Sequence, residues 1–293
     1  MRRWSPNFLR YLANFFGKKG ILFHFSVTAM MNFIKTDIHI KRKIMILDEL
    51  KEKALKSIEK NKLTLESFHL GELFTYVLVK NQNRSAKGVA LTPLNEGELL
   101  EKDFNSLEEI LEEKSFNPAS RAIALAAINA VGQYELQEQN LDLKKDLREE
   151  GFKLILKNSQ EKDKIVFIGN LRPLVKKLRE NSRDVTVFCR MKVEPQNGVY
   201  NDIFEYEAVN NADIVIITGA ALIGSTIDAL LKFTSKAKMV MISGFSVGLN
   251  PVWLKGTGIT HVASLYLDDS SKEEIEKDEL ENIFENRCYI QKI

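Results

Sequence analysis

Residues 164–169 read KIVFIG, and three similar apolar runs follow: VTVFC at 185–189, ADIVIITG at 212–219 and KMVMISG at 238–244. Each run is short and rich in aliphatic side chains, and segments with a helical pattern separate them. Strands that alternate with helices indicate a parallel sheet with right-handed crossovers. The sequence therefore predicts an α/β fold with a doubly wound, mostly parallel Rossmann-like sheet.

The remaining elements of this half are expected around the four runs. Pro173 marks the first turn of a helix, because proline is favoured at that position. The periodicity predicts a second helix at 225–233, a fifth strand at 259–267 and a closing helix at 272–285.

The preceding segment has a different order of elements. A helix is expected at 46–60. The pattern then predicts strands at 64–70, 73–80 and 88–92, followed by helices at 106–113 and 118–134. The last helix contains ASRAIALAAINAV, which is apolar on almost every side. Such a helix is typically buried, so we expect it to be the centre of a small α+β domain.

The chain has 293 residues, a length that suits two domains better than one. With 44% hydrophobic and 28% charged residues, the composition excludes collagen, coiled coil and disorder throughout. We expect four segments: a basic extension at 1–44, the small α+β domain at 45–140, a connector at 141–163 and the Rossmann-like domain at 164–293.

Residues 1–44 differ from the rest in charge and composition. They carry nine basic side chains and one acidic side chain, a net charge of +8, and six of the 17 phenylalanines. A secretory signal and a basic, aromatic segment at a membrane surface are two interpretations. We favour a third, in which translation starts at Met45, because an ordinary amphipathic helix begins there.

Charge and cysteine content limit the cellular compartment and the kinds of binding partner that we expect for the protein. Residues 45–293 hold 33 basic and 39 acidic side chains, a net charge of −6, which argues against nucleic-acid binding. Cys189 and Cys288 are too few for a disulfide framework, so a reducing cytoplasm is expected. No membrane association is expected for 45–293, and the sequence leaves open whether the chain forms a homodimer.

Small and hydroxylated residues follow the predicted strands, where ligands bind in such sheets. Glycines let the backbone approach a ligand, and hydroxyls can donate to an anion or cap the next helix. The candidates at these strand ends are Gly169, Arg190, Thr218, Gly219, Thr226, Ser243, Gly244 and Ser246. Many of them could be purely structural, with Thr226 a helix cap and Arg190 a solvated charge.

Common cofactor sites are disfavoured. The first turn offers only Gly169 in place of the glycine fingerprint of a dinucleotide site, and Cys189–Arg190 replaces the acid that would hold a ribose, so NAD is disfavoured. A phosphate loop of the Walker type is absent. His69 and His261 have no ligand-pair spacing with the cysteines, so no metal-binding residues are assigned.

Three longer motifs resemble a known family. ADIVIITGAALIGSTIDALL followed by MISGFSVGLNPVWL is similar to the Rossmann-like domain of the "putative heavy-metal chelation" family, and SFNPASRAIALAAINAV is similar to its N-terminal companion domain. The resemblance covers about residues 45–284. It implies an enolase N-terminal-like fold for the small domain and a site in the cleft between the two domains. It implies no established reaction.

The resemblance can be carried to individual positions. It implies roles for Thr218, Gly219, Thr226, Gly244 and Ser246, and for Asn129 in the buried helix. The chain departs from the family pattern at Phe245, where proline is usual, at Gly224–Ser225, where Asn-Gly is usual, and at Cys189, where glutamate is usual. The loss of that carboxylate weakens any acid–base or metal chemistry at this corner. Asn129 has two readings, because a buried amide needs partners: it lines the cleft, or it bonds to a neighbouring strand.

Three functions remain open on these grounds. The first is a site between the domains for a small anionic or metal-linked ligand, with any catalysis unassigned. The second is a non-catalytic protein that binds a metal or a metal chelate. The third is a transferase that uses a nucleotide or S-adenosylmethionine, which the missing glycine fingerprint disfavours.

Overall fold

The computed structural model describes residues 44–94, 102–190, 193–267 and 287–293. Residues 44–293 form one compact unit. Residues 1–43 of the basic extension lie outside the described residues, so the structure does not test its interpretations. The predicted closing helix at 272–285 also lies outside them. The predicted domain boundaries stay a prediction.

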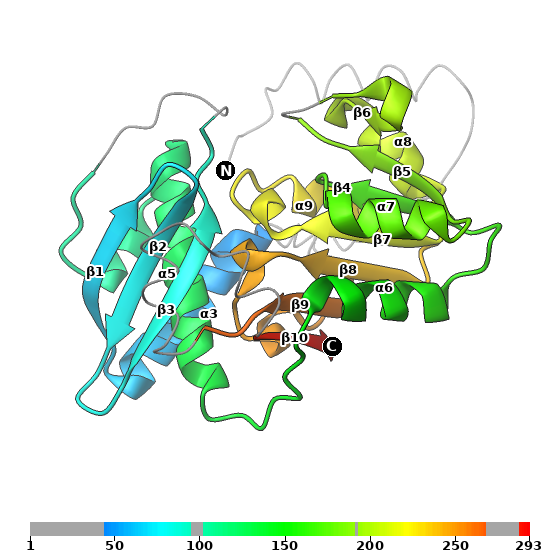
Figure 1. The fold of residues 1–293 in the computed structure, drawn as a ribbon. Coiled ribbons are helices and arrows are strands. Elements are labelled where there is room, and N and C mark those ends of the chain that lie inside the picture. Colours follow the sequence, from blue (N-terminus) through cyan, green and yellow to red (C-terminus); the bar gives the residue numbers. More distant parts are fainter. Residues whose placement is uncertain (1–43, 95–101, 191–192, 268–286) are drawn as a thin grey trace, which may run out of the picture. The chain divides into compact units, whose positions relative to one another are not determined.

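A seven-stranded sheet forms the larger part of this unit (Figure 1). Its strand order is β10-β9-β8-β7-β4-β5-β6, with all neighbours parallel except β9 and β10. The strands are β4 (Lys164–Ile168), β5 (Asp184–Phe188), β6 (Val199–Tyr200), β7 (Ile214–Thr218), β8 (Met239–Ser243), β9 (His261–Leu265) and β10 (Cys288–Lys292). The predicted mostly parallel α/β sheet is confirmed.

The two faces of this sheet bury different side chains. Ile165 and Phe167 of β4 pack with helices α6 (Leu147–Asn158) and α7 (Arg172–Glu180) in one apolar cluster. Val166 and Ile168 point to the other face, which is covered by α8 (Glu205–Asn210) and α9 (Ile227–Leu230). Such alternation on strands that are buried on both faces explains why their sequences are continuously apolar.

An antiparallel three-stranded sheet lies at one end of the unit, with order β1-β2-β3 (Figure 1). Its strands are β1 (Thr64–Leu70), β2 (Phe74–Lys80) and β3 (Ser85–Leu91), and its helices are α3 (Ile46–Asn61), α4 (Leu107–Glu112) and α5 (Pro118–Leu136). Helix α5 is buried along nearly its whole length, as its apolar sequence predicts. We call this sheet with its helices the small lobe, and the elements from α6 to β10 the large lobe.

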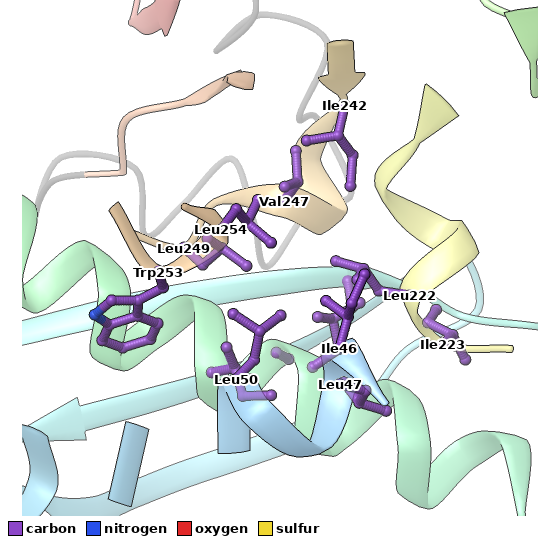
Figure 2. Packing of buried hydrophobic residues seen from close by; sticks show 14 of the residues in the cluster. Ile46, Leu47, Leu50, Leu222, Ile223, Ile242, Val247, Leu249, Trp253 and Leu254 are labelled. Carbon is purple, nitrogen blue, oxygen red and sulfur yellow. The ribbon is translucent and has the colours of Figure 1, made fainter. Parts of the chain in front are cut away.

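The two lobes share one hydrophobic core. Ile46, Leu47 and Leu50 at the start of α3 belong to the same buried cluster as Leu222 and Leu254 of the large lobe. Figure 2 shows these side chains converging from both lobes. A continuous apolar core disfavours independent movement of the lobes, because separation would expose it to water.

The structure adds elements that the sequence patterns did not predict. Helix α6 begins within the segment that was expected to be a connector. It was not predicted because only Leu147, Gly151 and Ile155 bury its inner face, and the charged residues between them obscure the helical pattern. The helix expected at 225–233 is split into α9 and a short 3₁₀ turn. Strand β6 and helix α8 are too short for a clear period, and the sequence of β10, CYIQK, is only partly apolar. No helix within the described ranges is long and apolar enough to cross a bilayer.

Candidate functional site

A hollow with a volume of about 420 Å³ opens at the carboxyl ends of β4, β7 and β8. Both lobes line it. The lining residues are Phe74, Leu91, Leu147, Arg148, Asn170, Leu171, Arg172, Pro173, Leu174, Thr218, Ala220, Ser243, Gly244, Phe245 and Ser246. We refer to this feature as the hollow.

Neighbouring parallel strands bring the polar lining residues together. Strand β7 lies between β4 and β8, and Thr218 at the end of β7 pairs with Ser243 at the end of β8. Gly244 follows with φ of +113° and ψ of 176°, a backbone conformation that is open almost only to glycine. The chain thereby turns from β8 into the 3₁₀ turn Phe245–Val247 at the edge of the hollow.

Ser243 is the most informative polar residue of the hollow. It is 94% buried, with 6% of its surface exposed, and no residue in the described part of the chain forms a hydrogen bond with its hydroxyl. The oxygen is not among the fully buried, unsatisfied side-chain atoms of the described residues, so it is accessible from the hollow that Ser243 lines. The arrangement is understandable if a ligand or water in the hollow completes the hydrogen bonding.

The N-terminus of α7 supplies one further donor. Its N-cap residue is Leu171, and among the described residues no side chain caps the helix. Of the first four residues of the helix, only Arg172 has an amide that forms no hydrogen bond with the described residues, because Pro173 has no N–H and the amides of Leu174 and Val175 donate to the carbonyl of Leu171. This amide and the helix dipole favour a negatively charged group at this position.

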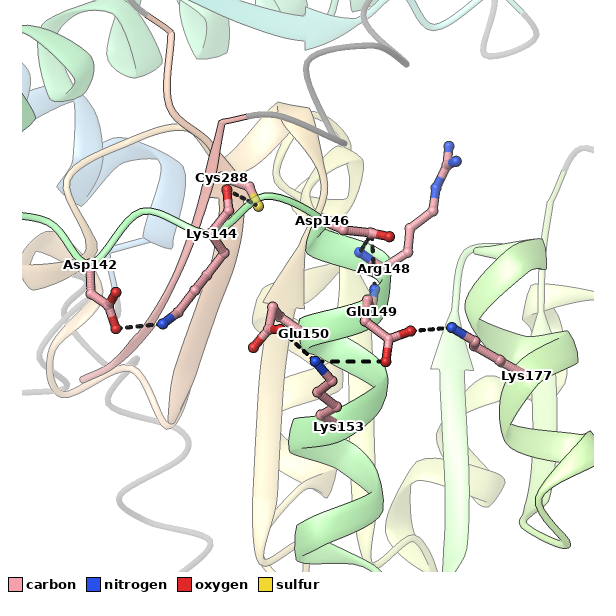
Figure 3. A network of polar contacts seen from close by, with 9 residues as sticks. All are labelled: Asp142, Lys144, Asp146, Arg148, Glu149, Glu150, Lys153, Lys177 and Cys288. Atoms are coloured by element: carbon pink, nitrogen blue, oxygen red, sulfur yellow. Dashed lines mark hydrogen bonds and ion pairs between the residues drawn. The ribbon is translucent and has the colours of Figure 1, made fainter.

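Two arginines add positive charge. Arg148 follows Asp146, which caps α6 by accepting bonds from the amides of Arg148 and Glu149. Figure 3 shows the guanidinium of Arg148 extending away from the ion pairs that Glu149 forms with Lys153 and Lys177. Arg172, at the start of α7, is half exposed and lies 3.5 Å from a carboxylate oxygen of Glu194. Both arginines place positive charge beside the hollow, and Arg172 shares part of its charge with Glu194.

The small lobe closes one side of the hollow. Phe74 on β2 pairs in register with Leu91 on β3. The amide of Leu91 donates a 2.9 Å hydrogen bond to the hydroxyl of Ser246, which follows Phe245 in the large lobe. The rings of Phe74 and Phe245 meet edge to face, with centroids 4.7 Å apart. This side of the hollow is consequently apolar and aromatic.

Nine residues were predicted for the site, and four of them line the hollow: Thr218, Ser243, Gly244 and Ser246. Their hydroxyls differ in availability. Ser246 is committed to Leu91, and Thr218 accepts only a long 3.4 Å bond from the amide of Ala220. Their predicted role in ligand binding stays a prediction.

Two predicted glycines lie behind the hollow. Gly169 has a φ of +98°, and a Cβ placed there would lie 2.8 Å from the Cβ of Thr218. Gly219 packs against the backbone of Ser246, which a Cβ would approach to 2.8 Å. Both positions therefore support the lining residues and do not themselves line the hollow.

The other three predicted residues lie elsewhere. Asn129 is fully buried and donates a 2.8 Å bond to the carbonyl of Val89 on β3, which matches the structural reading of this residue. Arg190 pairs with Asp202 at 2.7 Å. Thr226 occupies the N-cap position of α9, but its side chain bonds weakly to the carbonyl of Ala221, at 3.5 Å, and does not cap the helix.

Sequence reasoning missed several lining residues. Asn170 and Arg172 stand directly after the first strand, so their position was a usable signal. Arg148 belongs to a helix that the patterns did not predict, and Phe74 comes from another lobe. Their placement depends on tertiary packing, which periodicity does not specify.

The described residues contain no group of three or more histidine, cysteine, aspartate or glutamate side chains that could hold a metal ion. Burial raises the pKa of Cys288 to about 12, so this thiol stays protonated and is a poor metal ligand. Burial also lowers the pKa of His261, whose Nδ1 lies 2.8 Å from the hydroxyl of Thr260. The donors around the hollow suit an anion better than a bare heavy metal.

Comparison with known proteins identifies matching sequence families, a similar protein and solved structures with a similar fold. Residues 51–132 and 153–274 match two sequence families, both described as "Putative heavy-metal chelation". An uncharacterised protein of Methanocaldococcus jannaschii is 35% identical over 238 residues, which is 78% of this chain and 89% of that protein.

Two solved structures are similar, and both are of proteins of unknown function from the family that residues 153–274 match. The one from Pyrococcus horikoshii has a TM-score of 0.68 at 30% identity, covering 85% of this chain and 100% of that chain. The one from Desulfitobacterium hafniense has a TM-score of 0.63 at 18% identity, covering 83% and 98% of the two chains, and shows the shared fold.

Proposed function

This chain belongs to the family described as "Putative heavy-metal chelation", and on that premise we propose that the hollow binds a small anionic ligand, either free or as an anionic chelate of a metal. The observation that carries the proposal is the hydroxyl of Ser243, which forms no hydrogen bond with the described residues and is accessible from the hollow. A ligand oxygen would complete its hydrogen bonding.

The surroundings of Ser243 favour a negative charge. Arg148 and Arg172 carry positive charge, and the amide of Arg172 at the start of α7 is a donor that forms no bond with the described residues. The described lining contains no aspartate or glutamate that would oppose an anion. Charge-assisted hydrogen bonds from guanidinium groups are about twice as strong as neutral ones, so a carboxylate or phosphate is the best match.

The family description raises the question of how a metal would be held. Soft metals prefer thiolate and imidazole ligands, and the described lining offers hydroxyl, amide and guanidinium groups instead. These groups do not fit direct coordination of a heavy metal. A metal would therefore enter as the cargo of an anionic chelator, with the protein contacting the chelator.

Binding is better supported than catalysis. The described lining has no histidine, cysteine or carboxylate that could move a proton near neutral pH. A non-catalytic binding protein for an anion or a chelate is therefore the function that these residues serve best. A nucleotide- or S-adenosylmethionine-using transferase gains no specific support from the hollow.

Isothermal titration calorimetry with citrate, with Ni²⁺ alone and with the Ni²⁺–citrate complex tests the proposal. We expect heat of binding with citrate or with the complex, and weak or no binding of Ni²⁺ alone at the hollow. Arg172→Gln should weaken anion binding about five- to thirty-fold, which corresponds to 1–2 kcal/mol. Lys176→Gln is the matched control, because it removes one charge from the same helix at a residue outside the hollow.

Measurements on the two variants can also contradict the proposed function. If neither citrate nor its nickel complex binds, or if Arg172→Gln and Lys176→Gln bind equally well, the hollow is not the anion site. Tight binding of Ni²⁺ alone that survives both substitutions would point to a different site and a different function.

A further inference from the structure

The aromatic side of the hollow bears on which anions it accepts. Phe74 comes from the small lobe and Phe245 from the large lobe, and both line the hollow. Their rings meet at 90° with centroids 4.7 Å apart, the edge-to-face arrangement that aromatic pairs prefer. Each ring remains partly exposed.

Several contacts hold this pair in position. Phe74 is fixed by its register with Leu91, and Leu91 is bonded at 2.9 Å to Ser246, the neighbour of Phe245. Both rings also pack on the buried cluster that contains Val89 and Leu265. The aromatic surface is therefore largely formed before a ligand arrives, which lowers the entropic cost of binding.

The size of the hollow also argues against a purely inorganic anion. Its volume of about 420 Å³ falls within the range of about 300–1,000 Å³ that is typical of pockets for organic ligands. Leu91, Leu171 and Ala220 add further apolar side chains to its lining. An oxyanion bound near Ser243 would leave this apolar surface in contact with water.

We infer that the ligand is an aromatic oxyanion, an aryl carboxylate or aryl phosphate, whose charged group is held by Ser243, the start of α7 and the arginines and whose ring packs against Phe74 and Phe245. This inference rests on the proposed function and specifies its ligand class. Ring-to-ring contact adds binding free energy beyond simple burial of apolar area, so the hollow distinguishes an aromatic ligand from an aliphatic one.

Matched probes separate the charged group from the ring. Phenyl phosphate, cyclohexyl phosphate and inorganic phosphate share the charged group and differ in what is attached to it. We expect the full chain to bind phenyl phosphate at least tenfold more tightly than inorganic phosphate, and several-fold more tightly than cyclohexyl phosphate, in calorimetric titrations.

Substitutions locate the ring contact. Phe245→Leu and Phe74→Leu keep an apolar side chain and should reduce the preference for phenyl over inorganic phosphate at least threefold. Phe68→Leu is the matched control, because Phe68 forms a similar edge-to-face pair with Phe104, at 5.8 Å, away from the hollow. It should leave the preference unchanged.

The outcomes separate this inference from the proposed function. Equal affinity for phenyl and inorganic phosphate, with both weakened by Arg172→Gln, would overturn the aromatic specificity and leave the anion site standing. No binding of any phosphate, or binding that is indifferent to Arg172→Gln, would overturn both. If a phenylalanine variant fails to fold, the ranking of phenyl over cyclohexyl phosphate on the unaltered chain decides the question, and equal affinities would refute the inference.

Discussion

The hydroxyl of Ser246 accepts a 2.9 Å hydrogen bond from the backbone amide of Leu91, so a serine beside the hollow connects the large lobe to the last strand of the small lobe. Ser246 is 97% buried, with 3% of its surface exposed. Its side chain is therefore committed to the structure, in contrast to Ser243 three residues earlier. This difference between two nearby serines leads to opposite expectations for the same substitution.

Ser246→Ala is expected to lower the free energy of unfolding by about 1–3 kcal/mol, because the amide of Leu91 loses its acceptor in a partly buried position. Chemical denaturation followed by circular dichroism measures the change. A variant as stable as the unaltered chain would show that water replaces the serine, and that this bond does not help to hold the lobes together.

Ser243→Ala is expected to leave the free energy of unfolding within about 0.5 kcal/mol of the unaltered value, because its hydroxyl has no partner among the described residues. Its affinity for citrate should nevertheless fall about five- to thirty-fold through the loss of one hydrogen bond to a charged ligand. Chemical denaturation measures the free energy of unfolding, and calorimetric titration measures the affinity for citrate. Clear destabilisation with unchanged citrate affinity would assign this serine a structural role.

The fold and the part of the hollow at the strand ends are predictable for a common physical reason. Apolar runs such as residues 212–219 show which strands are buried on both faces, and the carboxyl ends of parallel neighbours share one edge. Thr218 and Ser243 therefore come together without any knowledge of side-chain packing.

The rest of the hollow depends on contacts between distant segments. Arg148 lies on a helix whose inner face is only Leu147, Gly151 and Ile155, too sparse a pattern among charged residues to be recognised. Phe74 reaches the hollow only because the small lobe packs on the large one, through contacts such as the bond between Leu91 and Ser246. Local periodicity carries no information about such packing.

Gly244→Ala is expected to destabilise the chain by about 1–3 kcal/mol, because φ of +113° with ψ of 176° is strained for any residue with a Cβ. No atom lies within 4 Å of the position a Cβ would take, so backbone strain alone is responsible. Thermal denaturation measures the loss.

Gly151→Ala is the matched control for this glycine. Gly151 lies inside α6, and a Cβ there would meet only the Cδ2 of Leu174 at an ordinary 3.7 Å. Alanine is favoured over glycine in a helix by about 0.8–1.0 kcal/mol, so this variant should be more stable. Equal effects of the two substitutions would contradict the strain at Gly244.

Glu205 should make stability depend on pH. This carboxyl is 4% exposed, and burial, together with the charge of Asp202, raises its pKa from 4.5 to about 7. A group with a higher pKa in the folded chain binds its proton more tightly there, so its contribution favours the folded state at low pH. As the pH rises from 4.5 to 7 this contribution is lost progressively, and above pH 7 the loss is constant.

Glu205→Gln removes this titration and should raise the free energy of unfolding by about 1–3 kcal/mol at pH 8, while leaving it nearly unchanged at pH 4. Denaturation at both pH values measures the difference between variant and unaltered chain. Glu207→Gln is the matched control, because Glu207 lies exposed on the same helix and should give a similar small effect at either pH. A Glu205→Gln effect of the same size at pH 4 and pH 8 would mean that the carboxyl does not change protonation between them, because a pH-independent gain comes from packing and not from charge.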